Sequence, residues 1–172
     1  SEHDAVDEFA SVIAAASQAL PGRRTEYWGA DALDRVNARV GESFALSERA
    51  QNHLSRNRYP WPERMLEHVE RLADLADAWS ALKRANTVPA ERLEDWARAQ
   101  FDLRIALHDK GILEKDAYFE FENRRLCNRP HVKVDDRVSP SECGRIYFGL
   151  DERPEEESWR IVVDHIGLHD RS

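Results

Sequence analysis

The chain has 172 residues and a formal net charge of −8 at neutral pH; 34% of its residues are charged and 41% are hydrophobic. These proportions are typical of a folded globular protein and exclude a disordered chain. No apolar run approaches the roughly 20 residues that a bilayer-spanning helix needs, so we expect no membrane association. Most of the acidic excess lies before residue 124, where it disfavours phosphate-rich partners.

The first two-thirds of the chain begin with a series of predicted amphipathic helices. Apolar residues recur every three or four positions over 6–20, 33–40 and 46–54, which is the spacing of one helix face. Proline and glycine follow the first segment and glycine follows the second, and both residue types end helices. We therefore expect three helices before the Pro-rich segment 59–62.

The strongest helix prediction covers 62–84, where apolar residues form one stripe and charged residues the opposite side. After a short connection the same spacing continues over 93–107 and stops at a Lys-Gly pair. Two long helices joined by so short a link are expected to form an antiparallel hairpin. A last helix is expected at about 113–126. We assign most of the five tryptophans to core packing.

From residue 131 the pattern changes to period two, with β-branched and aromatic residues that favour strands. Strands are expected within 131–135, 145–151 and 159–166, separated by turn-rich connectors. The sequence thus predicts an α+β fold with five to six helices, including the long hairpin, followed by a C-terminal three-stranded antiparallel β-meander. We expect a helical region over 1–125 and a small sheet over 126–172, packed together as one compact unit.

Strand alternation collects polar side chains on the sheet face that points away from the helices. The expected members are His131, Lys133, Asp135, Arg145, Tyr147, Arg160 and Asp164, with Arg124, Arg125 and Arg129 nearby in the sequence. Two interpretations remain open. Either this is a solvent-exposed face in which Lys133 or Arg145 pairs with Asp135 or Asp164 across strands, or it is a binding surface.

The segments "GRIYFGLD" (144–151) and "WRIVVDHIGLH" (159–169) resemble the closing strands of RelE/ParE-type toxins, small proteins with helices before an antiparallel sheet. The resemblance covers less than a third of the chain. It implies a metal-independent ribonuclease whose sheet residues bind phosphate and assist proton transfer. By this resemblance, Arg145 matches the arginine of a family strand and His169 the basic end of the last strand.

Such a ribonuclease needs a base, a cation for the phosphate and an acid. His131 or His165, Arg145 and Tyr147 could fill these roles. Strand parity places His165 on the apolar face unless a bulge intervenes, which makes His131 the better candidate. The catalytic set under this hypothesis is therefore His131, Arg145 and Tyr147.

A metal site is the third interpretation of the tail. Its candidate ligands are Cys127, His131, Cys143 and His169, but their spacing matches no zinc motif. Buried thiols and surface imidazoles explain them as well, and the chain has no glycine-rich phosphate loop. We expect no metal and no cofactor. Two cysteines without a signal peptide indicate reduced thiols and a cytoplasmic location.

The missing catalytic signature and the acidic helical surface favour a non-enzymatic protein-interaction or regulatory domain. We expect a protein partner, with the domain acting as an accessory component of a bacterial stress or defence system. The alternative is the metal-independent ribonuclease, or a nucleic-acid-binding domain that uses the C-terminal sheet. The expected binding residues are Arg124, Arg125, Arg129, Lys133, Asp135, Arg160 and Asp164.

Overall fold

The computed structural model describes residues 25–56, 59–135 and 143–169. Its helices are α2 (Thr25–Asn37), α3 (Glu48–Arg56), α4 (Pro62–Arg84) and α5 (Leu93–Phe101), with short 3-10 turns η2 (Glu114–Asp116) and η3 (Pro154–Glu156). Its strands are β1 (Phe44–Leu46), β2 (Ile105–Ala106), β3 (Tyr118–Phe121), β4 (Arg124–Cys127), β5 (His131–Val134), β6 (Gly144–Arg153) and β7 (Ser158–Leu168). Across these ranges, no helix has the length and apolarity to cross a membrane.

Five strands form one mixed sheet in the order β1-β7-β6-β5-β2, and β3 and β4 form a separate two-stranded hairpin. Strand β1 runs parallel to β7, whereas the other neighbours are antiparallel. The fold is α+β, but the predicted three-stranded meander is wrong, because β1 and β2 extend it on both sides. The prediction of five to six helices is also wrong: the described ranges hold four α-helices. The helix predicted at 6–20 lies outside them.

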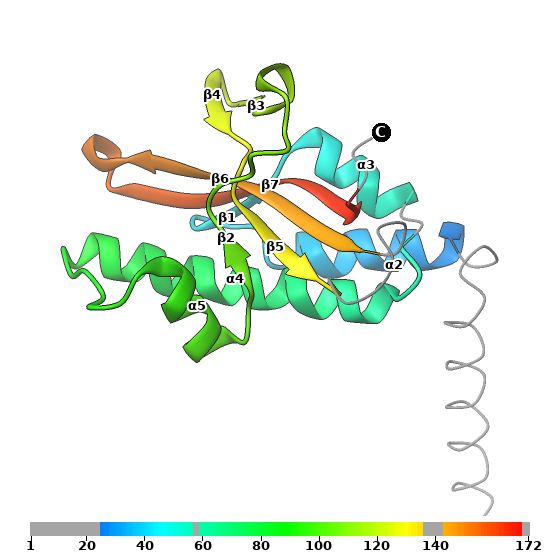
Figure 1. Ribbon diagram of the computed structural model, residues 1–172, viewed down its shortest axis with the longest axis horizontal. Helices are drawn as coiled ribbons and strands as arrows, with labels where there is room; N and C mark the ends of the chain where they lie inside the picture. Colours follow the sequence, from blue (N-terminus) through cyan, green and yellow to red (C-terminus); the bar gives the residue numbers. More distant parts are fainter. Residues whose placement is uncertain (1–24, 57–58, 136–142, 170–172) are drawn as a thin grey trace, which may run out of the picture.

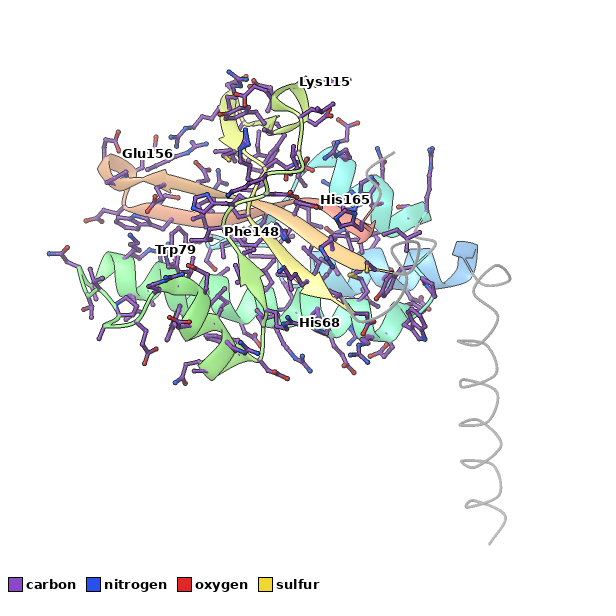
Figure 2. All side chains as sticks on the ribbon, in the orientation of Figure 1. His68, Trp79, Lys115, Phe148, Glu156 and His165 are labelled. Carbon is purple, nitrogen blue, oxygen red and sulfur yellow. The ribbon has the colours of Figure 1, made fainter. Side chains whose placement is uncertain are left out.

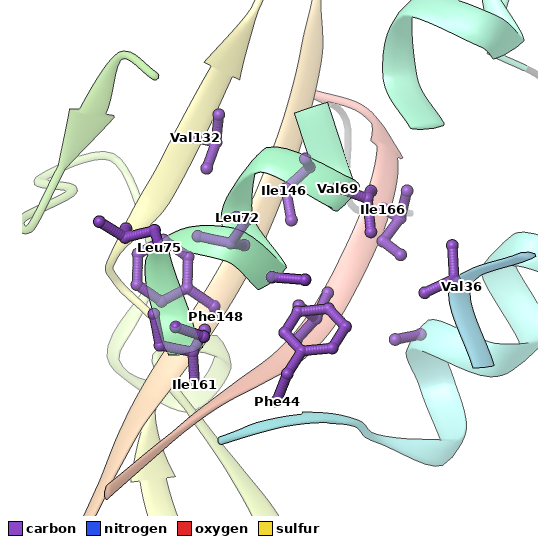
Figure 3. Packing of buried hydrophobic residues seen from close by; sticks show 14 of the residues in the cluster. Val36, Phe44, Val69, Leu72, Leu75, Val132, Ile146, Phe148, Ile161 and Ile166 are labelled. Carbon is purple, nitrogen blue, oxygen red and sulfur yellow. The ribbon is translucent and has the colours of Figure 1, made fainter. Parts of the chain in front are cut away.

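Helix α4 lies across one face of the sheet (Figure 1). Its apolar stripe meets the core-facing residues of β6 and β7, as Figure 3 shows for Leu72 beside Ile146 and for Leu75 near Phe148. All four side chains are fully buried. The helix predicted over 62–84 is therefore present, and its stripe faces the sheet rather than a second long helix.

The helix predicted at 113–126 is wrong, because this segment forms η2, β3 and β4. Phe121 pairs with Arg124, so only Glu122 and Asn123 remain in the turn. Both turn residues have positive φ, 48° and 63°, which is the backbone of a tight type I′ hairpin turn. The aromatic residues of this segment therefore follow period two rather than helical spacing.

The helix predicted over 93–107 extends too far. Helix α5 ends at Phe101, and Asp102 adopts the left-handed conformation with φ of 52°. An aspartate tolerates this conformation better than most residues, so it can end a helix as glycine does. The chain then enters β2, which pairs with β5. The region predicted to be helical, residues 1–125, thus also holds strands β1, β2 and β3, and the sheet draws on both halves of the sequence.

Candidate functional site

The second face of the sheet, away from α4, collects the imidazole and phenol groups. His131 pairs with Tyr147, and Tyr147 pairs with His165 across β5, β6 and β7. The register shifts between Tyr147 and Phe148, so that Phe148 pairs with Val163 and one residue of β7 is extra. This β-bulge turns His165 to the face that carries His131 and Tyr147. The bulge therefore reverses the assignment of His165 to the apolar face.

Four rings form a continuous row from α3 to β5, which we call the ring row. The ring centroids of His53 and His165 are 4.8 Å apart, those of His165 and Tyr147 5.5 Å, and those of Tyr147 and His131 5.1 Å. His131, Tyr147 and His165 are 6%, 1% and 4% exposed, and Figure 2 shows His165 beside the C-terminal end of β7. The row is thus an interior feature.

Internal hydrogen bonds occupy polar atoms of the row. The Tyr147 hydroxyl donates to Oδ2 of Asp109 at 3.0 Å, and Nδ1 of His131 bonds to the carbonyl oxygen of Arg129 at 2.9 Å. Nε2 of His165 bonds to the carbonyl oxygen of Leu168 at 2.8 Å. Burial lowers the pKa of His131, although the bond to Arg129 opposes this. In this fold, all three side chains therefore have hydrogen-bond partners within the protein.

Lys133 and Arg145 form a cross-strand pair on the same face as His131 and Tyr147. The three residues of the predicted catalytic set therefore share one face. Arg145 donates to the carbonyl oxygen of its neighbour Gly144 at 2.8 Å. Because His131 and Tyr147 are buried, this region of the sheet is not the solvent-exposed face that the first interpretation assumed.

The two carboxylates expected to pair with Lys133 or Arg145 have other partners. Asp135 accepts a hydrogen bond from the Tyr59 hydroxyl at 2.6 Å and lies 2.7 Å from the Arg64 guanidinium. Asp164 is 3% exposed and belongs to the bulge of β7. Asp135 thus links the sheet to the start of α4, and Asp164 links it to the start of α3.

The Asp164 carboxylate is the centre of a buried hydrogen-bond network. Its Oδ1 accepts from the Ser47 hydroxyl at 2.8 Å, and its Oδ2 accepts from Nδ2 of Asn128 at 2.8 Å and from Arg49 at 2.7 Å. Three donors balance the desolvation of this carboxylate. The network joins α3, the connection before β5, and β7, so we assign Asp164 to structure rather than to ligand binding.

The β3–β4 hairpin stands on the sheet side opposite α4 (Figure 1). Its inner face packs Phe119, Phe121 and Leu126 against Ala45 and Val162 of the sheet. Gly149 of β6 permits this approach: a Cβ there would lie 3.0 Å from Leu126 Cβ and Phe119 Cε1. The hairpin is therefore fitted closely to the sheet.

A charge cluster fixes the tip of the hairpin. The Asp151 side chain is 0% exposed and contacts Arg124 at 2.8 Å, Arg160 at 2.7 Å and Arg153 at 3.3 Å. Glu122 of the hairpin turn contacts Arg160 at 2.6 Å. Burial would raise the pKa of Asp151, but the hydrogen bonds from Arg160 and Arg153 outweigh it and lower that pKa. Arg124 and Arg160, which we predicted to bind a ligand, thus bind internal carboxylates.

The outer face of the hairpin remains open. Strand alternation and register place four side chains there, Tyr118, Glu120, Arg125 and Cys127, and we call them the outer hairpin face. The Arg125 guanidinium lies 4.1 Å from the centre of the Tyr118 ring, and that of Arg129 lies 6.0 Å from it. Arg129 also contacts Glu114 at 2.7 Å. Arg125 and Cys127 are exposed.

A recess of about 460 Å³ adjoins this face between α3 and the hairpin. We call it the α3–hairpin recess. Its α3 side consists of Ser47, Glu48, Arg49 and Asn52, its hairpin side of Lys115, Asp116, Tyr118, Phe119 and Glu120, and Asp164 of β7 also lines it. The recess is polar and carries charges of both signs, with two aromatic side chains in its wall. Figure 2 shows Lys115 at the hairpin end of the molecule.

The predicted binding residues therefore separate into three groups. Lys133 lies beside the ring row, and Asp135, Asp164, Arg124 and Arg160 serve internal contacts. Of the residues predicted to bind, only Arg125 and Arg129 lie at the outer hairpin face. Their partner Tyr118 was missed, because helical spacing was assigned to its segment. Only Asn123, a residue type that tolerates positive φ, hinted at the turn, because the usual Asn-Gly or Asp-Gly signal of a type I′ hairpin is missing at 122–123.

The candidate metal ligands lie on different elements. Cys127 is exposed on β4, Cys143 is buried next to the start of β6, and the two cysteines form no disulfide with each other. The amide of His169 donates to the carbonyl oxygen of Cys143 at 2.7 Å. Among the residues with assigned structure, no group of three or more His, Cys, Asp or Glu side chains is arranged to hold a metal ion.

Comparison with protein-family models, with curated proteins and with solved structures found no match for this chain. The similarity to RelE/ParE-type toxins therefore stays a hypothesis based on the closing strands. The function of the chain is inferred from its own geometry.

Proposed function

We propose that this chain is a cytoplasmic protein-interaction domain that binds its partner through the outer hairpin face and the α3–hairpin recess. The observation that carries the proposal is the two-sided construction of the β3–β4 hairpin. Its inner side is fixed by Phe119 and Phe121 against the sheet, while its outer side presents an arginine stacked on a tyrosine. The two cysteines, which form no disulfide with each other, support a reducing compartment.

The composition of this face supports protein binding. Tyrosine and arginine are enriched among the residues that contribute most to interface affinity. The stacking of Arg125 on Tyr118 holds both side chains in one arrangement before a partner arrives. Less side-chain entropy is then lost on association, which favours affinity.

The rigidity of the support favours the same conclusion. The buried Asp151 and its arginine contacts fix the hairpin tip on β6 and β7. A preformed surface of this kind suits a partner that docks without refolding of the domain. The role within a bacterial stress or defence assembly belongs to this proposal and rests on the sequence alone.

The ribonuclease hypothesis receives less support from the same geometry. His131 and Tyr147 are buried, and the Tyr147 hydroxyl already donates to Asp109. A phosphate that binds the Tyr147 hydroxyl would have to displace the Asp109 carboxylate from it. We therefore place the functional surface on the hairpin and not on the ring row.

Site-specific photo-crosslinking in cells of the source organism tests the proposal. A benzophenone amino acid at Tyr118 is expected to capture a defined protein, which mass spectrometry identifies. The same amino acid at Val88, which is 81% exposed in the α4–α5 connection, serves as the control and is expected to capture nothing specific. Equal capture at the two positions, or no specific capture at Tyr118, would contradict the proposal.

Affinity measurements with the captured partner give a second test. Arg125→Ala and Tyr118→Ala are each expected to raise the Kd about fivefold or more, because truncating a central interface residue costs over roughly 1 kcal/mol. Val88→Ala is expected to leave the Kd unchanged. The purified protein is expected to carry no bound nucleic acid and to show no ribonuclease activity. This result would favour protein interaction over the ribonuclease or nucleic-acid-binding alternative.

A further inference from the structure

Helix α3 is joined to β7 by an imidazole. Helix α3 packs on β7, and the backbone amide of Ile166 donates to Nδ1 of His53 at 3.3 Å. The His53 ring also meets the edge of His165, with centroids 4.8 Å apart. In Figure 1, α3 lies beside the C-terminal end of β7. His53 thus connects the C-terminal half of α3 to the last strand.

The direction of the Ile166 bond fixes the protonation state of His53. An imidazole nitrogen can accept a hydrogen bond only when it carries no proton. His53 is therefore neutral in this arrangement, with its proton on Nε2. A protonated imidazole donates from both nitrogens, so uptake of a proton would leave the Ile166 amide without this acceptor and set two N–H groups against each other.

The surroundings oppose a positive charge on His53. Burial and the neighbouring guanidinium of Arg49 on α3 disfavour the charged form, whereas the Asp164 carboxylate on β7 favours it. The Asp164 carboxylate already accepts from Arg49 and Ser47. His165, the ring nearest to His53, bonds through Nε2 to the Leu168 carbonyl oxygen and adds another titratable group.

The rest of the ring row continues this pattern. Beyond His165 lies Tyr147, and then His131, around which Asp109 contributes a negative charge while Arg145 and Lys133 contribute positive charges. Several buried histidines therefore lie on one face of the sheet, and each of them can take up a proton as the pH falls. His53 is the member of the row that lies on a helix, so it is the member whose protonation acts on a separate packing element.

We propose that His53 is a pH-sensitive latch that holds the C-terminal half of α3 on β7 at neutral pH and releases it in acid. The N-terminal end of α3 stays attached through the hydrogen bonds of Ser47 and Arg49 to the Asp164 carboxylate, which themselves contain no imidazole. The helix then pivots about this end. Because Asn52, next to His53, lines the α3–hairpin recess, release reshapes the recess; that consequence rests on the proposed function.

Amide exchange measured by NMR tests the latch without any partner. The exchange rate of the Ile166 amide is corrected for its intrinsic pH dependence and compared with that of Leu72 in α4. Burial holds the pKa of His53 below its ordinary 6.5, so the comparison runs from about pH 7.5 down to about pH 4.5. Over this range we expect the relative protection of Ile166 to fall at least about fivefold, since the ratio of protonated to neutral imidazole changes tenfold per pH unit. Unchanged relative protection would overturn the proposal.

Two variants separate the latch from general acid sensitivity. His53→Asn keeps an acceptor oxygen close to the Nδ1 position but cannot take up a proton in this range, so its Ile166 protection is expected to stay constant. His68→Asn on α4 makes the same exchange at a histidine whose Nδ1 bonds to the Arg64 carbonyl, and it is expected to retain the wild-type response at Ile166. Loss of protection in His53→Asn equal to that of the wild type would also overturn the latch.

The same variants connect the latch to the recess. Crosslinking from position 118 is repeated on purified protein and cell extract at the two pH values. A pH-dependent yield in the wild type and a constant yield in His53→Asn are expected. If the crosslinking yield is constant with pH in both proteins while Ile166 exchange changes as predicted, only the effect on the recess is refuted. If the exchange test fails while position 118 still captures a specific partner, the latch is refuted and the proposed function is retained.

Discussion

The hydroxyl of Ser47 donates a hydrogen bond to Oδ1 of Asp164 at 2.8 Å and accepts one from the amide of Ala50 at 3.1 Å. Ser47 thus caps the first turn of α3 and at the same time attaches that helix to a strand 117 positions further along the chain. Because both side chains are buried, one hydroxyl determines where α3 begins and where it docks.

Ser47→Ala is expected to lower the free energy of unfolding by about 1–3 kcal/mol. The change removes a helix cap, which costs about 1 kcal/mol, and takes one donor from a buried carboxylate. Urea unfolding followed by circular dichroism measures the effect. Ser55→Ala is the matched control, because Ser55 is exposed on the same helix and its hydroxyl donates to the Gln51 carbonyl oxygen of that helix; an equal loss in both variants would contradict the assigned role.

The periodicity of apolar residues was sufficient to predict the long helix and the long strands. The stripe over 62–84 identified α4, and the alternation from 131 onward identified β5, β6 and β7. In α4, β6 and β7 one side of the element packs on the core over many residues, so the apolar pattern repeats several times. Short elements lack this repetition. β1 has three residues and β2 has two, and each is defined by a partner strand far along the chain.

The candidate site likewise has features that the sequence could predict and features that it could not. Alternation alone places His131 and Tyr147 on one face, and the register agrees. It does not reveal that this face is covered, because Asp109 and His53 reach it from distant segments. The bulge that turns His165 depends on pairing between β6 and β7 and has no local pattern. Sequence reasoning therefore grouped these residues but could not determine their burial.

Gly149→Ala is expected to move the β3–β4 hairpin. Its new Cβ would lie 3.0 Å from Leu126 Cβ and 3.1 Å from the Cys127 carbonyl oxygen, atoms that shift only if the hairpin shifts. Overpacking of this kind costs about 1–3 kcal/mol. Chemical-shift changes should extend over β3 and β4, and partner binding should weaken.

Gly41→Ala is the control for this change. A Cβ at Gly41 meets nothing within 4 Å, so stability is expected to stay within about 0.5 kcal/mol of the wild type. If Gly149→Ala left both the hairpin resonances and the unfolding free energy unchanged, the close fit of hairpin and sheet would be incorrect.

Asp151→Asn is expected to destabilise the protein by about 2–3 kcal/mol at neutral pH. It removes the buried negative charge that Arg124, Arg153 and Arg160 share, and a broken buried pair costs about 3–5 kcal/mol, less here because the arginines are partly exposed. Urea unfolding at pH 7 measures the difference, and an unchanged unfolding free energy would contradict the role of the cluster.

The same variant has a predictable pH dependence. The folded-state pKa of Asp151 lies below its ordinary 3.8 because of its arginine hydrogen bonds, which outweigh burial. The unfolded chain therefore binds more protons, and the stabilisation present above the unfolded pKa is lost as pH falls through the folded pKa. The difference in unfolding free energy between the wild type and Asp151→Asn should narrow below about pH 4. A constant gap down to about pH 2 would show that Asp151 does not titrate in this way.

His131→Phe tests the interior ring row nearer to neutral pH. Burial lowers the pKa of His131 below its ordinary 6.5, so the unfolded state takes up protons first and the wild type loses stability as pH falls below about 6.5. Phenylalanine keeps the ring contact with Tyr147 but loses the bond to the Arg129 carbonyl, at about 1 kcal/mol. The variant should be the less stable form at about pH 7.5 and should approach or exceed the wild type at about pH 5.5. Equal slopes of unfolding free energy against pH in the two proteins would mean that His131 is not held neutral by its burial.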